Sequence, residues 1–346
     1  MKVHFHLSRL ANAIIGHSMA KPPLLLLPPD YVHDATMAIK KAKKRVSFVC
    51  MMVTDDEETD KLIDALNEAS LRGVHVEVAA DVFTYGELSG HFIPTGYFTK
   101  KARATTEMAR RFQTSNVNFS WLGRFANTPF TGRTHIKWCV VDDDIYSFGG
   151  VNLYSEGIKN NDYMFKVTDA KLASVLDDEL DRLVRADNGR FSYRSRSIPS
   201  TYGTVHIDGG LPLDSVIYRR VCTLTRDAAS VLYVSQYGPT GRLNRLLKKT
   251  NSKLYFNTGK DATLLNKLLI RATHFLTHTK TRYKKKNYLH AKFMIFTMSD
   301  GSKIAVTGSH NFIHAGVLLG TREIALETEN PAVITQLETF FTDHVA

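Results

Sequence analysis

Cysteine is scarce in this sequence, and long apolar runs are absent. Cys50, Cys139 and Cys222 are too few and too scattered among 346 residues for a disulfide framework or a cysteine metal site. All three lie in apolar stretches, so we expect buried free thiols in a reducing compartment. No apolar run approaches the roughly 20 residues that a membrane-spanning helix needs, and the N-terminal segment shows no signal-peptide cleavage pattern. We therefore expect a cytoplasmic protein, or one bound peripherally to the inner face of the cell membrane.

Acidic residues are also in short supply. The chain has 34 Asp and Glu against 45 Lys and Arg, which gives a net charge of +11 and a pI near 9.4. Such an excess favours a polyanionic partner, which is nucleic acid, an anionic membrane surface or a phosphate-bearing substrate. The charge alone does not choose among them.

What the sequence does contain is an order of helices and strands that occurs twice. The first half is predicted to contain helices over residues 35–44, 56–72 and 170–186 and buried strands over 46–53 and 74–80. The second half repeats this with helices over residues 213–228 and 243–249 and strands over 231–236 and 253–256. Alternation of this kind predicts an α/β fold with mixed sheets flanked by helices.

Both halves also carry the same polar landmarks in the same order. Each has a His-x-Lys motif, then a Gly-[Gly/Ser]-x-Asn turn, then an acidic residue. The members are His135, Lys137, Asn152 and Asp162 in the first half, and His290, Lys292, Asn311 and Glu323 in the second. Internal repetition indicates two similar domains. We place them at residues 1–197 and 198–346, joined in the polar segment after residue 186.

The repeated residue types suit chemistry at phosphorus. On a strand, residues i and i+2 share one face, so the histidine and lysine of each motif are expected to point together. Lysines and turn asparagines can hold the non-bridging oxygens of a phosphate. One histidine can attack the phosphorus while the other protonates the leaving oxygen and then activates an alcohol or water. Each imidazole needs an acceptor for its second nitrogen, for which Asp162 and Glu323 are the candidates. This scheme requires no metal and no other cofactor.

At this point the chain resembles the phospholipase D superfamily, whose signature is H-x-K-x4-D followed by x6-G-[GS]-x-N. The first copy fits throughout, with His135, Lys137, Asp142, Gly149, Gly150 and Asn152. The second copy departs, because the aspartate position holds Thr297 and Asp300 lies displaced in a longer loop. The resemblance implies that Asp142 is structural, that His135 attacks, and that His290 is the acid and base. It also implies a pseudo-twofold arrangement of the halves with the active site between them, for which a monomer suffices.

Four further residues are predicted to contact the substrate. Gly150 and Ser309 lie in the two turns, and Arg133 directly precedes the first motif. His310 lies inside the second turn, where it either touches the phosphate or packs the turn.

Three segments have two readings each. Residues 84–100 form either an ordinary loop or a pocket wall or lid that contacts the membrane. Residues 24–27 form either a strand packed on the core or an apolar surface element. The basic run 281–290 forms either a solvated hairpin or a patch that draws anionic lipid or nucleic acid towards the site.

The class of substrate stays open at this stage. The turn and the acidic segment that follows it look most like the bacterial phosphatidylserine, phosphatidylglycerophosphate and cardiolipin synthase branch. That likeness implies a phosphatidyltransferase or phospholipase acting on anionic phospholipid at a membrane surface. The alternative is a metal-independent nuclease or nucleic-acid phosphodiesterase, which the positive charge also suits. A scaffold without activity is a third reading, and the full catalytic set in both halves argues against it.

Overall fold

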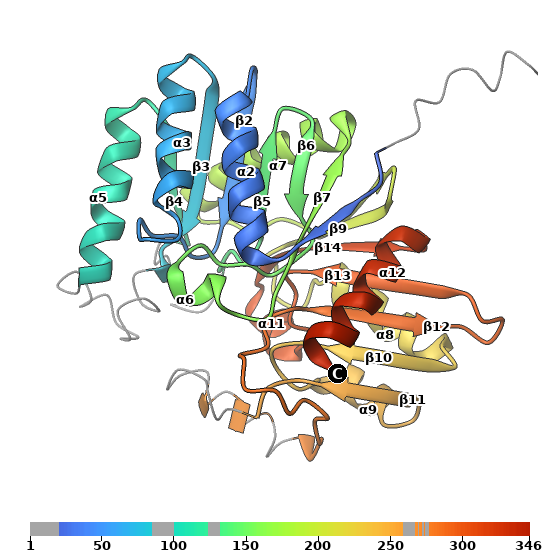
Figure 1. Ribbon diagram of the computed structural model, residues 1–346. Helices are drawn as coiled ribbons and strands as arrows, with labels where there is room; N and C mark the ends of the chain where they lie inside the picture. Colours follow the sequence, from blue (N-terminus) through green and yellow to red (C-terminus); the bar gives the residue numbers. More distant parts are fainter. Residues whose placement is uncertain are drawn as a thin grey trace, which may run out of the picture.

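The computed structural model describes residues 21–84, 100–123, 132–258, 267, 268, 270, 271, 273 and 277–346, which form two seven-stranded sheets flanked by helices (Figure 1). The first sheet has the strand order β1-β7-β6-β5-β2-β3-β4. Its strands are β1 (Leu24–Leu26), β2 (Arg45–Cys50), β3 (His75–Asp81), β4 (Asn118–Leu122), β5 (Trp138–Val141), β6 (Asp144–Ser147) and β7 (Met164–Thr168). Strands β2, β3 and β4 are parallel and the other pairings are antiparallel. The predicted α/β class with mixed sheets is confirmed.

The second sheet repeats six strands of the first in the same order and adds β8 at one edge, where the first has β4 at the other. Its strands are β8 (Arg196–Ser200), β9 (Gly203–Gly209), β10 (Ser230–Val234), β11 (Asn251–Tyr255), β12 (Phe293–Thr297), β13 (Lys303–Gly308) and β14 (Arg322–Thr328). They lie in the order β11-β10-β12-β13-β14-β9-β8, with β10 and β11 parallel. The antiparallel run β12-β13-β14 corresponds to β5-β6-β7, so each His-x-Lys motif leads into the same part of its sheet.

Helices cover the outer face of each sheet. In the first half these are α2 (Pro28–Lys41), α3 (Asp60–Leu71) and α5 (Lys100–Thr114), and in the second half α8 (Val216–Asp227), α9 (Gly241–Leu247) and α11 (His314–Leu319). A short helix, α6 (Ser155–Ile158), follows the first asparagine turn. Each outer layer has its own buried apolar cluster.

Two helices lie between the sheets and join the halves into one core. These are α7 (Ala170–Asn188) and α12 (Pro331–Phe340), the latter continued by a π-helical turn, Phe341–Val345. Along α7, Leu172, Leu176, Leu180 and Leu183 recur at helical spacing and are all buried. They share one apolar cluster with α12 and with the inner faces of both sheets. Burying these faces against each other fixes how the two sheets are placed, and therefore how the two motifs meet.

Several predicted boundaries need correction. The helix expected from residue 35 begins at Pro28, because a proline suits the first turn of a helix, where its missing N–H is not needed. Helix α5 and strand β4 were not predicted at all. Residues 24–27 do contribute a strand, β1, which pairs with β7. The basic run 281–290 forms no hairpin, because no ladder joins its residues.

The chain passes from the first sheet to the second between Asn188 and Arg196. Strand β8 thus straddles the predicted boundary at residue 197 and belongs wholly to the second sheet. Of the predicted loop 84–100, residues 85–99 lie outside the described residues, as do residues 124–131 before the first motif. All three cysteines are free and buried, as expected.

Candidate active site

The two histidines lie in extended segments that directly precede β5 and β12, not on the strands as predicted. Each segment gives its backbone hydrogen bonds to the opposite half of the molecule. The N–H of His135 donates to the carbonyl of Arg322 at 2.9 Å, and the N–H of His290 donates to that of Asn161 at 2.9 Å. The ladder within each sheet begins only after the lysine, at Trp138 and at Phe293.

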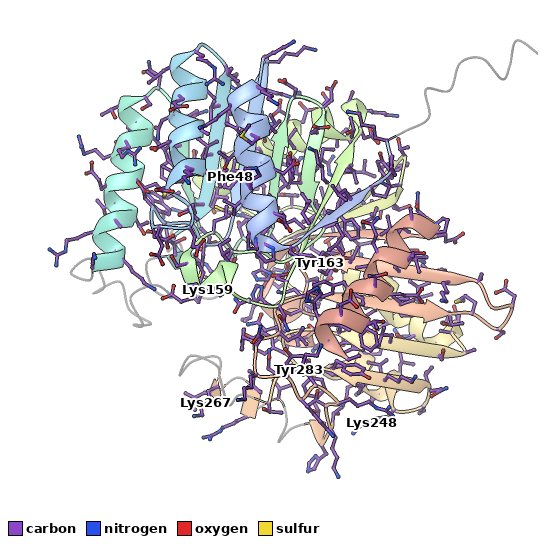
Figure 2. All side chains as sticks on the ribbon, viewed as in Figure 1. Phe48, Lys159, Tyr163, Lys248, Lys267 and Tyr283 are labelled. Atoms are coloured by element: carbon purple, nitrogen blue, oxygen red, sulfur yellow. The ribbon has the colours of Figure 1, made fainter. Side chains whose placement is uncertain are left out.

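Each imidazole is hydrogen-bonded to the acid of the other half. Nδ1 of His135 lies 3.0 Å from Oε2 of Glu323, and Nδ1 of His290 lies 2.7 Å from Oδ2 of Asp162. All four side chains are buried. This reciprocal exchange is the contact pattern of an approximate twofold axis and brings both motifs into one site. Tyr163, beside Asp162, marks the junction of the halves in Figure 2.

The two acids are held by different groups at the same position of each turn. Asp162 accepts hydrogen bonds from the backbone N–H groups of Gly150 (3.2 Å) and Tyr163 (2.8 Å). Glu323 accepts one from the hydroxyl of Ser309. A Cβ on Gly150 would stand 2.8 Å from Nζ of Lys292, so only glycine fits there. Gly150 and Ser309 were predicted to contact substrate, and the structure places both against the carboxylates.

Both lysines are buried without a counter-ion. Lys137 is 1% exposed and Lys292 is 0% exposed, and within the described part of the chain neither forms an ion pair. Nζ of Lys137 donates to the carbonyl of His135 at 3.0 Å, and Nζ of Lys292 donates to that of His290. Burial lowers the pKa of Lys137 to about 8 and that of Lys292 to about 7. Two buried ammonium groups without a carboxylate in direct contact favour an anion between them.

The turn asparagines are also left without partners. The amide oxygens of Asn152 and Asn311 are buried and accept no hydrogen bond from any described residue. The same unsatisfied atom at the same position in both halves indicates a site for a ligand, because buried polar groups are otherwise paired. Either amide can turn to present its NH₂ group to an oxyanion.

The buried charges set the protonation of the imidazoles. Burial, together with the lysine charges, lowers the pKa of His135 to about 4 and that of His290 to about 3. Burial alone would raise the pKa of Glu323, but His135 outweighs it and holds this pKa at about 2. Both imidazoles are therefore neutral at pH 7, and each donates its Nδ1–H to an ionised acid. Nε2 of each ring, which has no hydrogen bond to the described residues, keeps its lone pair for a reaction.

Comparison with known proteins agrees with this arrangement. Residues 36–184 match the family model described as "Cardiolipin synthase, PLD-like domain". This part of the chain is thus similar to a phospholipase D-like domain. The resemblance read from the repeated motifs is thereby confirmed for the first half by an independent match.

Two of the similar proteins are phospholipid synthases. Cardiolipin synthase B of Salmonella typhimurium is 28% identical over 152 residues, which are 42% of this chain and 34% of that protein. The phospholipase D-like chain thus spans about a third of the length of this curated relative. Among solved structures, phosphatidylserine synthase of Haemophilus influenzae superposes with a TM-score of 0.72 at 12% identity, covering 94% of this chain and 87% of that one. Polyphosphate kinase of Porphyromonas gingivalis gives a TM-score of 0.60 at 10% identity, over 92% of this chain and 49% of that one. At these identities the two structures show a shared fold across both halves.

Asp142 has only backbone contacts in the phospholipase D-like fold. Its carboxylate accepts hydrogen bonds from the backbone N–H groups of Lys43 (3.0 Å), Lys44 (2.8 Å) and Arg45 (3.1 Å). It therefore ties the β5–β6 turn to the start of β2, which fits the structural role predicted for it. In the second half, Asp300 instead bonds to Ser302 within its own loop. Asp300 therefore does not form, in the second half, the contacts that Asp142 makes with the start of β2 in the first.

Two predicted substrate contacts have other partners. Arg133 is buried and its guanidinium pairs with Asp81 at 3.0 Å, so its charge is already compensated and we no longer place it in the phosphate cradle. His310 accepts the backbone N–H of Phe312 on Nδ1 at 2.8 Å, which gives it a role in shaping the turn. Its Nε2 has no partner among the described residues and still allows a contact with a ligand.

One ion pair behind the site was not predicted from the sequence. Arg322, which is 2% exposed, pairs with Asp187 at the end of α7 at 3.1 Å, and its N–H bonds to the carbonyl of Arg133. It directly precedes Glu323, so this pair helps to hold the acid that orients His135. The sequence feature that could have indicated this ion pair is the charge of Arg322 at the start of a strand whose central residues are apolar.

Among the residues that the structure describes, no group of three or more His, Cys, Asp and Glu side chains is arranged to hold a metal ion. Within the same residues, no helix combines the length and apolar character needed to cross a bilayer.

Sulfate is expected to stabilise the protein in a pH-dependent way. The depressed lysine pKa values mean that charged Lys137 and Lys292 cost stability below about pH 7, and this cost is relieved as the pH rises. A bound anion offsets this loss of stability at the lower pH, where the two lysines are charged. Sulfate keeps its charge from pH 6 to 9, so we expect a rise in melting temperature of about 2–4 °C at pH 6 that shrinks towards pH 9.

Scanning calorimetry against sodium chloride of equal ionic strength measures this shift. Lys292→Met removes one of the two charges and should abolish most of the effect. A shift that grew with pH, or that persisted in this variant, would contradict a cradle built on the buried lysines.

Proposed function

We propose that this chain is a phospholipase D-type enzyme that transfers or hydrolyses a phosphatidyl group through a covalent phosphohistidine. The observation that carries the proposal is the crossed pair of contacts, His135 with Glu323 and His290 with Asp162. It gives one site two neutral imidazoles, each held by an ionised acid, beside two buried lysines. The similarity to two phospholipid synthases supports lipid as the substrate class.

In the first step, Nε2 of His135 attacks the phosphorus of the phosphodiester. A P–N bond forms, and the bond from phosphorus to the leaving alcohol breaks. The positive charge that develops on His135 is matched by Glu323 through Nδ1–H, at the 3.0 Å contact already in place. Lys137, Lys292 and the two asparagine amides hold the non-bridging oxygens while negative charge builds on them.

The leaving oxygen takes a proton from Nε2 of His290. Because His290 is neutral in the free protein, it must gain this proton when substrate binds. The negative charge of the phosphodiester, placed beside the imidazole, raises its pKa and supplies the driving force. Asp162, at 2.7 Å from Nδ1, stabilises the resulting imidazolium.

The second step reverses these roles. Neutral His290 removes a proton from an acceptor alcohol or from water, whose oxygen attacks the phosphorus. The P–N bond breaks and returns the lone pair to His135. An alcohol gives transfer and water gives hydrolysis. Because both half-sites lie on one chain, we propose that a monomer is sufficient.

A nuclease is the competing function, because a basic protein with this site can also hold a nucleic-acid phosphodiester. We expect turnover of phosphatidylglycerol in mixed micelles, measured by mass spectrometry of the products, and no cleavage of single-stranded DNA or plasmid under the same conditions. His135→Ala serves as the blank in both assays. Cleavage of DNA that is lost in His135→Ala, without lipid turnover, would replace the lipid proposal with the nuclease.

A further inference from the structure

The positive charge of the chain is concentrated in one segment. Residues 242–286 contain thirteen lysines and arginines and one acidic residue, Asp261. The excess of cationic over acidic residues in this segment is larger than the net charge of +11 of the entire chain. Positive and negative charges are therefore nearly balanced in the rest of the chain. A local excess of this size has to be explained by something that the segment binds or repels.

In the described part of the segment, most of these cations are exposed. Ten exposed residues define a basic face, on and beside α9 and β11 and in residues 280–286: Arg242, Arg245, Lys248, Lys249, Lys253, Lys280, Arg282, Lys284, Lys285 and Lys286. None of the ten forms an ion pair with a carboxylate in the described ranges. The charge of the basic face is thus available to a partner.

The parts of the basic face are fixed to each other by hydrogen bonds. The N–H of Arg282 donates to the carbonyl of Leu254 in β11 at 2.8 Å, and Nζ of Lys248 donates to that of Thr277 at 2.8 Å. Figure 1 places α9 and β11 along the lower edge of the molecule, and Figure 2 shows Lys248 there. The same segment leads directly into the second motif, since Lys286 lies only a few residues before His290.

Exposed leucines lie at the end of α11, a helix whose first residue contacts the residue before α9. Leu213, Leu318 and Leu319, which we call the leucine tip, are 67%, 50% and 39% exposed. The N–H of Leu213 bonds to the carbonyl of Val317, so the three lie together at the end of α11. The start of α11 touches the start of α9, where the N–H of His314 donates to Thr240 Oγ1 at 2.7 Å. Helix α11 itself follows the turn that carries Asn311.

We infer that the basic face and the leucine tip together bind the surface of an anionic lipid bilayer and hold the site against it. Stable attachment of a peripheral protein usually takes two signals, and here exposed cations lie on α9 and exposed apolar side chains on α11, whose first residue bonds to Thr240 just before α9. A nucleic-acid surface would interleave its cations with exposed aromatic rings for base stacking. In the described part of this region the large exposed apolar residues are leucines, while Tyr237, Phe256 and Tyr283 are buried. The choice of lipid rests on the proposed function, but binding can be measured without turnover.

Vesicle co-sedimentation with the His135→Ala protein tests this directly, because this variant cannot consume the lipid. We expect binding to vesicles of phosphatidylcholine with 30% phosphatidylglycerol, weak binding to pure phosphatidylcholine, and loss at 1 M salt. Each lysine near an anionic surface contributes about 1 kcal/mol, so Lys248→Gln, Lys249→Gln and Lys253→Gln together should weaken binding at least about tenfold. Leu318→Ala with Leu319→Ala should also weaken it.

Matched controls carry the same changes elsewhere. Lys40→Gln, Lys41→Gln and Lys43→Gln remove three exposed charges at the end of α2, which Figure 1 places at the opposite edge of the molecule. Leu71→Ala removes a leucine that is 68% exposed in the first half. Both controls should bind vesicles as the parent does. Equal losses in the controls, or no vesicle binding at all, would overturn the inference.

Two further outcomes separate this inference from the proposed function. Lipid turnover in detergent micelles without vesicle binding would support the proposed enzymatic function. It would overturn the inference that the basic face and the leucine tip bind a membrane. Tighter binding to DNA than to vesicles, lost in the basic-face variant, would assign the face to nucleic acid and overturn the inference.

Discussion

His290→Ala is expected to accumulate a phosphatidyl adduct that His135→Ala cannot form. Without His290, the nucleophile His135 remains, but no base activates the acceptor that would break the P–N bond. Turnover should fall at least about 10³-fold in both variants, because each step depends on one of the two rings. Intact-mass spectrometry after incubation with phosphatidylglycerol measures the adduct, and an acid-labile linkage identifies a phosphohistidine.

His33→Ala is a suitable control for this experiment. His33 is exposed on α2, so its loss should change neither turnover nor mass. An adduct found only in His135→Ala would exchange the roles of the two histidines. No adduct in either variant, with turnover lost in both, would argue for direct displacement and against a covalent intermediate.

The second large loss of activity is expected when either acid is neutralised. Each acid should affect the step that depends on the histidine of the other half. Glu323→Gln removes the charge that balances His135, so we expect the adduct to form about 10²- to 10⁴-fold more slowly. Asp162→Asn removes the charge that balances His290, so proton transfer to the leaving group and from the acceptor should slow instead. Rapid-quench measurement of adduct formation in Glu323→Gln, and of its breakdown in Asp162→Asn, distinguishes the two effects.

Double variants test the pairing itself. Glu323→Gln should have little further effect once His135 is alanine, since the two residues act as one unit. The matched control is Glu327→Gln, because Glu327 lies on the same strand and holds His206 at 2.9 Å outside the site. We expect its turnover to stay within about twofold of the parent. If Glu323 were instead coupled to His290, the crossed arrangement would be wrong.

The predicted chemistry and the fold class came from residue types that recur at fixed spacing. Two His-x-Lys motifs, two asparagine turns and two acids in the same order are enough to indicate a phosphodiester site and a duplicated α/β chain. Such a set can be recognised without a structure, because each motif consists of residues that are close together in the sequence. The same reasoning missed α5, whose sequence has few large apolar residues and therefore a weak helical period.

Three features of the site could not be predicted from the sequence. The sequence gives no sign that Glu323 belongs to His135, or that Asp81 takes the charge of Arg133. It also places both motifs on strands, although their backbones pair across the molecule. Each of these depends on contacts between residues that are far apart in the chain, and local propensity carries no information about them.

The sequence by itself determined which side chains are the candidates for the chemistry, because their type and spacing are properties of the chain. Only the tertiary structure decided which acid serves which histidine and which cations stay unpaired. The reason is that α7 and α12 pack between the two sheets and fix their relative placement. That placement brings each motif to the opposite half and leaves the basic face on one edge of the molecule.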